Sequence, residues 1–205
     1  SINFTTDNTG GDTTYSWTNT NSAIGLSNSG SGNINVTATN TTNDAITSTV
    51  TVTPSFEGCE GTPQTFTITV NPEPSIDNIE QEVCTGSGIS ITPTDGTIPV
   101  GTTYSWDALT SSPSGVITGG NSGTDETIIT ESELLNSTNS PAVLTYSVTP
   151  TTPDGCIGDP FSVSVTVNPL GQVDNPGDQE FCNNDNISIN FTTFKIYAHH
   201  CRNGS

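Results

Sequence analysis

The sequence predicts an all-β fold made of tandem β-sandwich repeats. Three observations lead to this prediction: short segments in which apolar residues alternate with Thr or Ser, motifs that return in the same order along the chain, and Gly, Pro, Asn and Asp between the segments. Alternation with a period of two places one side of a strand in a core and the other in solvent. No window shows the 3.6-residue period of an amphipathic helix.

The clearest strands are residues 65–70 and 161–167, in which every second residue is apolar. The intervening positions carry hydroxyl groups, so the outer face of each strand is polar and the chain needs few apolar residues, only 29%. The same alternation at Ile187, Ile189 and Phe191 predicts a further strand near the end of the chain.

Internal repetition is the strongest signal in the sequence. Thr13-Thr14-Tyr15-Ser16-Trp17 returns 89 residues later, and Thr69-Val70-Asn71-Pro72 returns 97 residues later. Other motifs recur in the same order, namely 52–54 at 148–150, 58–61 at 155–158, 80–84 at 178–182 and 1–6 at 188–193. The chain therefore holds copies of one structural unit.

These motifs predict four regions. Residues 1–72 form a repeat that lacks its first strand, 73–170 form a complete repeat, and 171–193 open a third. The longer second spacing places an insertion between Trp106 and Pro150, and we expect a variable loop region from Asp125 to Pro141.

Residues 194–205 match nothing before them, and we interpret them as the product of a frameshift, the end of a gene fragment or a cloning scar. The sequence begins within a predicted strand and shows no signal peptide, so we expect an internal piece of a longer exported protein.

The charge is strongly acidic. The net charge is −19, and Lys195 and Arg202 are the only basic residues besides two histidines. Nucleic acids and anionic lipids are recognised by Lys and Arg, so binding to nucleic acid is excluded. No apolar run approaches the roughly 20 residues that span a bilayer, and we expect no membrane insertion in this segment.

About seven short strands in roughly 95 residues are typical of an immunoglobulin-like sandwich. A sandwich with so few apolar residues needs its large aromatic side chains in the core. We therefore assign Trp17 and Trp106, with Tyr15 and Tyr104, to the cores of the two repeats.

The ordered motifs Tyr-Ser-Trp, Val-Thr-Pro, Gly-Cys-x-Gly, Thr-Val-Asn-Pro and Gln-Glu-Val-Cys resemble the PKD-like (Ig-like) repeats of Bacteroidetes secreted and cell-surface proteins, such as large gliding-motility-type adhesins. The resemblance covers residues 1–193. It implies a β-sandwich fold, an extracellular or outer-surface location and a spacer or adhesive role, and it supplies no catalytic residues.

Catalysis has little support. Residues 1–194 contain no His, Lys or Arg, which excludes Ser-His-Asp and Cys-His arrangements. Only paired carboxylates remain, as in glycoside hydrolysis, and Asp125, Glu126, Glu131 and Glu133 read as solvated loop acids. The sequence predicts no enzyme and no cofactor other than calcium.

A calcium site at the junctions between repeats is one open possibility. Carboxylates gather before the second and third repeats, at Asp77, Glu80, Glu82, Asp174, Asp178 and Glu180. Ca²⁺ takes six to eight oxygen ligands. Alternating acids also arise on an exposed strand face, and both interpretations stay open.

Four cysteines occupy repeated positions in an exported protein, which predicts disulfides. The first candidate is Cys84–Cys156, because both residues belong to the complete repeat. The alternative is Cys59–Cys84 with Cys156–Cys182. A standard immunoglobulin topology is awkward for both pairings, because it places a Cys before strand B and a Cys between strands F and G at opposite ends of the sandwich. Cys84–Cys156 stays the first candidate on the assumption that the first strand is short or irregular enough to bring its Cys to the other end.

Two functional classes remain. The first is a non-catalytic spacer or stalk whose partners are the other repeats of the same chain. The second is a module that binds a surface glycan or protein, including one that is accessory to a secreted hydrolase.

Overall fold

The computed structural model describes residues 1–107 and 109–191, and these residues form strands and one short 3₁₀ turn but no α-helix. The predicted all-β class is thus confirmed. Contacts between Cα atoms divide the chain into two compact units. Unit 1 comprises Ser1–Ile76, Asp95–Thr102 and Thr151–Asp159, and unit 2 comprises Asp77–Thr94, Thr103–Pro150 and the chain from Pro160.

The main sheet of unit 1 is antiparallel. Its central strand β3 pairs with β1 on one side and with β4 and β5 on the other, while β2 extends the sheet beyond β1. The strands are β1 (Thr13–Asn19), β2 (Ser29–Ser31), β3 (Ile46–Phe56), β4 (Cys59–Glu60) and β5 (Gln64–Val70), and the 3₁₀ turn η1 (Ser22–Ile24) follows β1. Strands β6 (Ser75–Ile76) and β9 (Gly96–Thr97) form a separate small pair.

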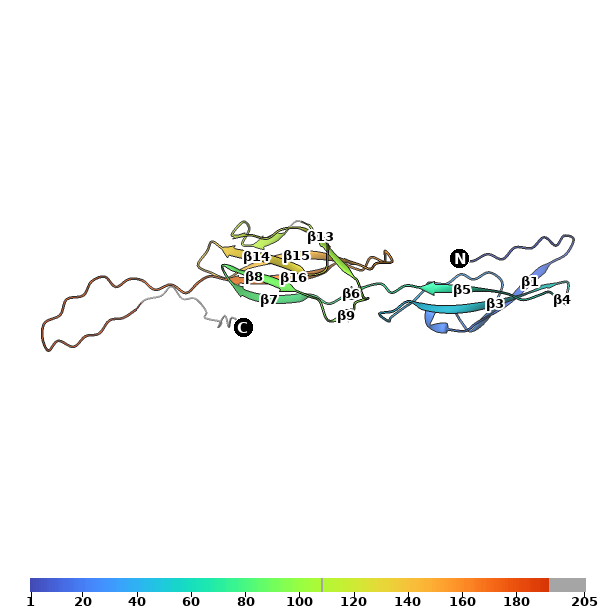
Figure 1. Cartoon of the computed structure of the whole chain (residues 1–205), viewed down its shortest axis with the longest axis horizontal. Coiled ribbons are helices and arrows are strands. Elements are labelled where there is room, and N and C mark those ends of the chain that lie inside the picture. Colours follow the sequence, from blue (N-terminus) through green and yellow to red (C-terminus); the bar gives the residue numbers. More distant parts are fainter. Residues whose placement is uncertain (108, 192–205) are drawn as a thin grey trace. The chain divides into compact units, whose positions relative to one another are not determined.

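Unit 2 is a two-sheet sandwich (Figure 1). One sheet has the order β13-β10-β15-β16-β7, and β11 pairs with β15; the other has the order β12-β14-β8. The edge strand β7 runs parallel to its neighbour, β16. The strands are β7 (Ile79–Cys84), β8 (Ser87–Ile91), β10 (Thr103–Trp106), β11 (Thr110–Ser112), β12 (Ile117–Thr118), β13 (Gly123–Glu126), β14 (Ile129–Asn136), β15 (Ala142–Thr151) and β16 (Phe161–Asn168).

The alternating pattern predicts the central strands correctly. In β16, Val163, Val165 and Val167 are fully buried, while the Ser and Thr residues between them are half-buried. The valines pack between the two sheets with Tyr146 of β15 and with Ile129 and Leu134 of β14, all of which are buried. Each fully buried Val or Leu contributes about 1.5–3 kcal/mol, so burial of this layer stabilises unit 2.

The core of unit 1 is smaller. Its buried members are Trp17, Ile24, Leu26, Ile34, Val50 and Val52. Several apolar residues that pack against this core, among them Phe4, Tyr15 and Phe66, are only partly buried.

The prediction of a variable loop from Asp125 to Pro141 is wrong. This stretch contains β14, whose buried Ile129 and Leu134 help to form the core. The added residues instead lie mainly between Trp106 and Ile129, where β11 and β12 have no named counterpart in unit 1. The comparison of motifs missed this because the interior of β14, residues 130–135, has no run of identical residues in the first repeat.

The strand predicted at Ile187, Ile189 and Phe191 is also absent. Residues 171–191 are exposed and form no strand (Figure 1). Alternation gives a stable strand only where a partner strand is available, and none of the described strands pairs with this segment. The prediction for 194–205 lies outside the described residues.

Candidate functional site

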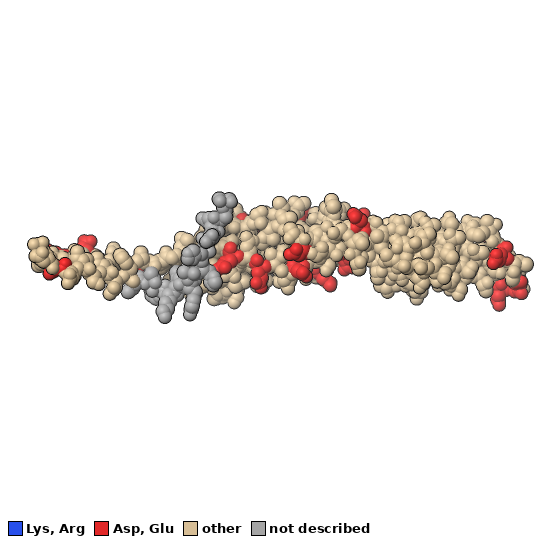
Figure 2. Space-filling view, turned by 90° about the horizontal axis from the view of Figure 1, so that it is seen from below, with Lys and Arg blue, Asp and Glu red and all other residues tan. Residues whose placement is uncertain are grey.

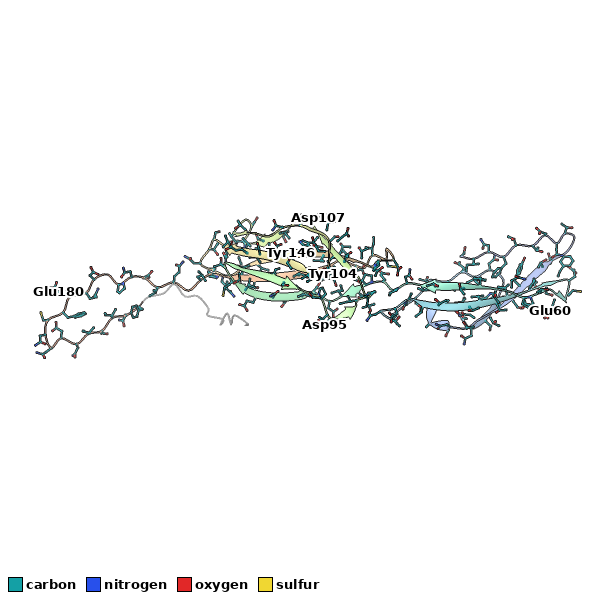
Figure 3. The ribbon with its side chains drawn as sticks, in the orientation of Figure 1. Glu60, Asp95, Tyr104, Asp107, Tyr146 and Glu180 are labelled. Carbon is teal, nitrogen blue, oxygen red and sulfur yellow. The ribbon has the colours of Figure 1, made fainter. Side chains whose placement is uncertain are left out.

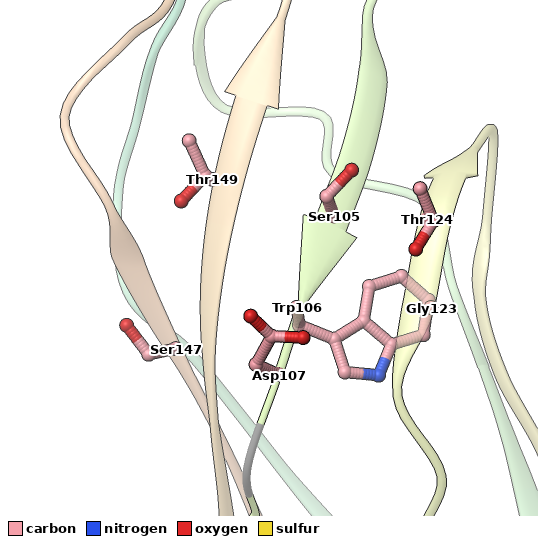
Figure 4. Close-up of a pocket in the computed structure, with 7 residues that line it drawn as sticks. All are labelled: Ser105, Trp106, Asp107, Gly123, Thr124, Ser147 and Thr149. Carbon is pink, nitrogen blue, oxygen red and sulfur yellow. The ribbon is translucent and has the colours of Figure 1, made fainter.

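A polar groove crosses the outer face of the β13-β10-β15 sheet in unit 2 (Figure 4). Trp106 and Gly123 form its floor, and its volume is about 520 Å³. Its walls consist of four hydroxyl side chains and one carboxylate, contributed by Ser105, Asp107, Thr124, Ser147 and Thr149. Four of these residues belong to three neighbouring strands, β10, β13 and β15, and Asp107 directly follows β10.

The floor of this groove is a tryptophan packed on a glycine. Trp106 is paired in register with Gly123, and a Cβ added to Gly123 would lie only 2.3 Å from the Cη2 atom of the indole. The ring therefore occupies the place of a side chain on β13. Because Trp106 is only 5% exposed, it offers no open ring face on which a sugar could stack.

A buried polar network holds the indole from the inside. The Nε1 of Trp106 donates to the carbonyl oxygen of Asn121 at 2.7 Å. Asn121 donates its backbone N–H and its side-chain amide to the two carboxylate oxygens of Glu131, each at 2.9 Å. The hydroxyl of Tyr146 donates to Glu131 at 3.3 Å. The network joins β10, β14 and β15 across the two sheets.

This network corrects the interpretation of Glu131 as a solvated loop acid. Glu131 is 6% exposed and lies in β14. Burial, the charge of Glu131 and their hydrogen bond all raise the pKa of the Tyr146 hydroxyl above its ordinary value. Burial alone raises the pKa of Tyr104 (both residues are labelled in Figure 3). Both carboxylate oxygens of Glu131 accept hydrogen bonds, from Asn121 and Tyr146, so this side chain links the strands around it.

The same groove recurs in unit 1. Its floor is Trp17 on Gly30, where a Cβ would lie 2.1 Å from the indole Cζ2, and its volume is about 300 Å³. The Nε1 of Trp17 donates to the carbonyl oxygen of Gly32 at 3.2 Å. The walls again carry hydroxyl groups, from Ser16, Thr18, Ser29, Thr51 and Thr53. Thr18 stands where unit 2 has Asp107.

Neither groove has the groups that hydrolysis requires. The groove of unit 2 contains one carboxylate and that of unit 1 none, whereas glycoside hydrolysis requires two facing carboxyl groups. The groups that line them can form hydrogen bonds through hydroxyl groups and, in unit 2, through the carboxylate of Asp107.

The residues predicted for calcium do not converge. Within residues 1–107 and 109–191, no three acidic, His or Cys side chains are grouped closely enough to hold a metal ion. Asp77 precedes the edge strand β7, and Glu80 and Glu82 lie within it. Glu82 accepts a hydrogen bond from the side-chain amide of Asn168. Asp178 and Glu180 lie on the exposed segment after β16 (Figure 3 labels Glu180). Calcium binding therefore stays a prediction from the sequence.

The predicted pair Cys84–Cys156 is not formed, because Cys156 carries a free thiol. Cys84 pairs in register with Asn168, the last residue of β16. Cys156 lies in the turn before β16, where its backbone N–H donates to the hydroxyl of Thr152. The alternative pairing is not formed either, since Cys59 and Cys182 are also free thiols.

Two asparagines have structural roles that the sequence analysis did not identify. Asn136 donates its side-chain amide to the carbonyl oxygens of Ser140 and Val167, each at 2.8 Å, and accepts from the backbone of Thr138. Asn40 repeats this pattern in unit 1. The available signal was the return of Asn-x-Thr-Asn at the same place in both repeats.

Comparison with known proteins gives one family. A model described as PKD-like domain matches residues 1–74 and 81–171. No curated protein matches the chain. Among solved structures, the chain is similar to human protocadherin-24 EC1-2, form II, with a TM-score of 0.37 and 14% identity over 76% of this chain and 81% of that one. It is also similar to domains 4 and 5 of the S-layer protein SbsC, with a TM-score of 0.26 and 15% identity over 75% of this chain and 70% of that one.

Proposed function

Because the chain belongs to the family of PKD-like domains, we propose that it is a non-catalytic, extracellular repeat segment that serves as a spacer or stalk. The parent protein would be a secreted or surface adhesin of the kind found in Bacteroidetes. In this proposal the partners of each repeat are its neighbours in the same chain. The proline-containing segments 71–74 and 168–169 favour extended connectors between them.

One observation carries the proposal. The grooves of the two units share the buried indole and the glycine packed against it. They differ at the position of the charged residue, which is Asp107 in unit 2 and Thr18 in unit 1. What recurs is therefore the part that stabilises the sandwich. This is expected of repeats selected for folding and spacing rather than for a shared ligand.

The charge of the surface is compatible with an extracellular location. Acidic side chains are scattered over the surface, and the part of the chain that the structure describes carries no Lys or Arg (Figure 2). Among these residues, no helix is long and apolar enough to span a bilayer. A high negative charge keeps a solvated protein monodisperse and away from anionic surfaces.

Two measurements test the proposal. Antibodies raised against the chain should label intact cells of the source organism as strongly as permeabilised cells, and the labelled chain should show no saturable binding on a glycan array. Labelling that requires permeabilisation would exclude the extracellular location. Saturable binding to a glycan would replace the spacer role with the second candidate.

The second candidate is a module that binds carbohydrate or protein, accessory to a secreted hydrolase. The groove of Figure 4 favours it, because convergent hydroxyl groups and Asp107 suit a polar ligand. If it is correct, titration with an oligosaccharide should shift the NMR signals of Thr124 and Ser147, and Asp107→Ala should weaken the binding. Shifts spread evenly over both sheets would exclude a site in this groove.

A further inference from the structure

The chain that follows β5 is packed rather than free. Its residues 71–76, which we call the connector, are part of unit 1 together with residues 95–102 and 151–159. Pro72 is buried, and less than 2% of Pro74 is exposed. A freely moving loop lies on the surface and has few buried contacts. The connector is therefore held by other parts of unit 1.

Gly158 covers Pro74 through a close approach of the two backbones. A Cβ added to Gly158 would lie 1.9 Å from the carbonyl oxygen of Pro74, so only glycine fits there. Gly158 is itself buried and lies just before β16. The turn that precedes it is fixed by Thr152, whose backbone N–H donates to the carbonyl oxygen of Cys156 at 2.9 Å. This turn and Gly158 hold the middle of the connector.

The end of the connector is paired with a second strand. The connector ends in β6, which runs antiparallel to β9 and places Ile76 opposite Gly96. Gly96 has a φ of 111°, and a Cβ there would lie 2.0 Å from the carbonyl oxygen of Ser75. Both the backbone conformation and the close approach require glycine at this position. The pairing ties the connector to the loop that contains β9, residues 95–102.

The side chain of Asn43 binds the same loop. The backbone N–H of Ile98 donates to the Oδ1 of Asn43 at 2.8 Å. Asn43 lies in the turn before β3, in which the side-chain amide of Asn40 donates to the carbonyl oxygens of Asp44 and Val70, each at 2.8 Å. Val70 is the last residue of β5 and directly precedes the connector. The turn therefore binds the strand before the connector and the loop that pairs with its end.

We propose that the connector is a stiff joint, locked by a clasp that consists of Asn43, the β6–β9 pair and Gly158. Bending at the connector would break the hydrogen bond between Asn43 and Ile98 and would expose the buried Pro74. The two prolines also restrict the backbone, because each fixes its own φ. The inference concerns the connector itself, and it holds whether the chain acts as a spacer or as a binding module.

A second turn of the same kind provides a matched control. Residues 136–139 before β15 repeat the pattern Asn-x-Thr-Asn of residues 40–43. Asn136 fixes this turn as Asn40 fixes the first, by donating to two carbonyl oxygens. Asn139 stands in the place of Asn43, is exposed and belongs to unit 2. Asn139→Ala therefore makes the same chemical change at a site outside the clasp.

Nitrogen-15 NMR relaxation of the whole chain tests the joint. In the original chain the amides of Asn71, Glu73 and Ser75 should have order parameters near about 0.85, the value of a rigid backbone. Asn43→Ala removes the acceptor of the Ile98 amide and should lower these order parameters. It should also speed the hydrogen exchange of the Ile98 amide by about fivefold, because a single hydrogen bond then no longer opposes local opening. Asn139→Ala should change neither quantity.

Two further variants separate the parts of the clasp, and the amides of β3 report whether each variant is folded. Asn43→Asp keeps an acceptor oxygen and should keep both the order of the connector and the slow exchange of Ile98. Gly158→Ala should loosen the connector with Asn43 intact, because the added methyl group collides with the carbonyl oxygen of Pro74.

The proposal fails if the connector amides of the original chain have order parameters below about 0.6, which is the range of a flexible backbone. It fails equally if Asn43→Ala and Asn139→Ala behave alike, or if Asn43→Asp loosens the connector as much as Asn43→Ala does. A connector that is unchanged in Gly158→Ala would remove Gly158 from the clasp.

Discussion

At the scale of single residues, each sandwich depends on a tryptophan that fills the space above a glycine. Gly123 has no open space for a side chain, because the indole of Trp106 occupies the position of its Cβ. Gly30 and Trp17 repeat the arrangement. The sequence predicts that both tryptophans belong to cores, but it does not identify the glycines as their partners, since each glycine lies 13 to 17 residues away across a turn.

We predict that Gly123→Ala destabilises unit 2 by about 1–3 kcal/mol, because the added methyl group forces the indole out of its position. Urea unfolding followed by tryptophan fluorescence measures the change. Gly171→Ala is the matched control, since nothing lies within 4 Å of a Cβ at that position. Equal midpoints for the two variants would contradict the packing argument.

The buried carboxylate gives a second prediction. Glu131→Gln should cost about 1–3 kcal/mol, because one of the two Asn121 donors then faces an amide NH₂ instead of an oxygen. Glu133→Gln removes the same charge from an exposed position of the same strand and should change the free energy of unfolding by less than about 0.5 kcal/mol. If Glu133→Gln lowers the free energy of unfolding as much as Glu131→Gln does, the buried network is not the source of the effect.

Tyr146 makes the stability of unit 2 sensitive to high pH. Its pKa is raised in the folded state above the ordinary 10.0, so the stabilising contribution is complete below pH 10 and is lost as the pH rises further. The free energy of unfolding should fall above pH 10 by up to about 1.4 kcal/mol per pH unit for this group. Tyr146→Phe should reduce that slope. An unchanged slope would mean that the alkaline loss arises elsewhere.

At the scale of elements, period-two alternation predicts β5 and β16, both of which pair with neighbouring strands. It succeeds for β16, whose valines alternate with Ser and Thr. It fails for β14, where the buried Glu131 breaks the pattern, and for Ile187 and Ile189, which alternate but have no partner strand. A sequence records which side of a strand is apolar. It does not record whether a neighbouring strand is present.

The turns before β3 and β15 are fixed by a single asparagine each. We expect Asn136→Ala to destabilise unit 2 by about 1–3 kcal/mol, because the carbonyls of Ser140 and Val167 lose their donor in a buried site. Asn40→Ala should affect unit 1 in the same direction. Asn35→Ala, at an exposed Asn-x-Thr sequence, serves as the control. Thermal melting with two resolved transitions would assign each effect to its unit; a shift for Asn35→Ala of equal size would refute the role of the turn.

At the scale of the whole molecule, the negative charge makes the stability of the chain depend on the salt concentration. A net charge of −19 in 205 residues, with no basic residue before Lys195, leaves the acids to repel one another without local compensation. Repulsion of this kind destabilises the compact state and opposes association between copies. Salt screens it, since the Debye length falls from about 30 Å at 0.01 M to about 3 Å at 1 M.

We therefore predict that raising NaCl from about 0.01 M to about 0.5 M increases the unfolding midpoint of the chain. CaCl₂ matched to the same ionic strength distinguishes screening from specific binding by Asp77, Glu80 and Glu82 or their counterparts. A midpoint that rises with Ca²⁺ well beyond the NaCl and MgCl₂ values would show a calcium site that screening does not explain. If the unfolding midpoint does not change with NaCl, the acidic side chains are too far apart for their repulsion to destabilise the folded chain.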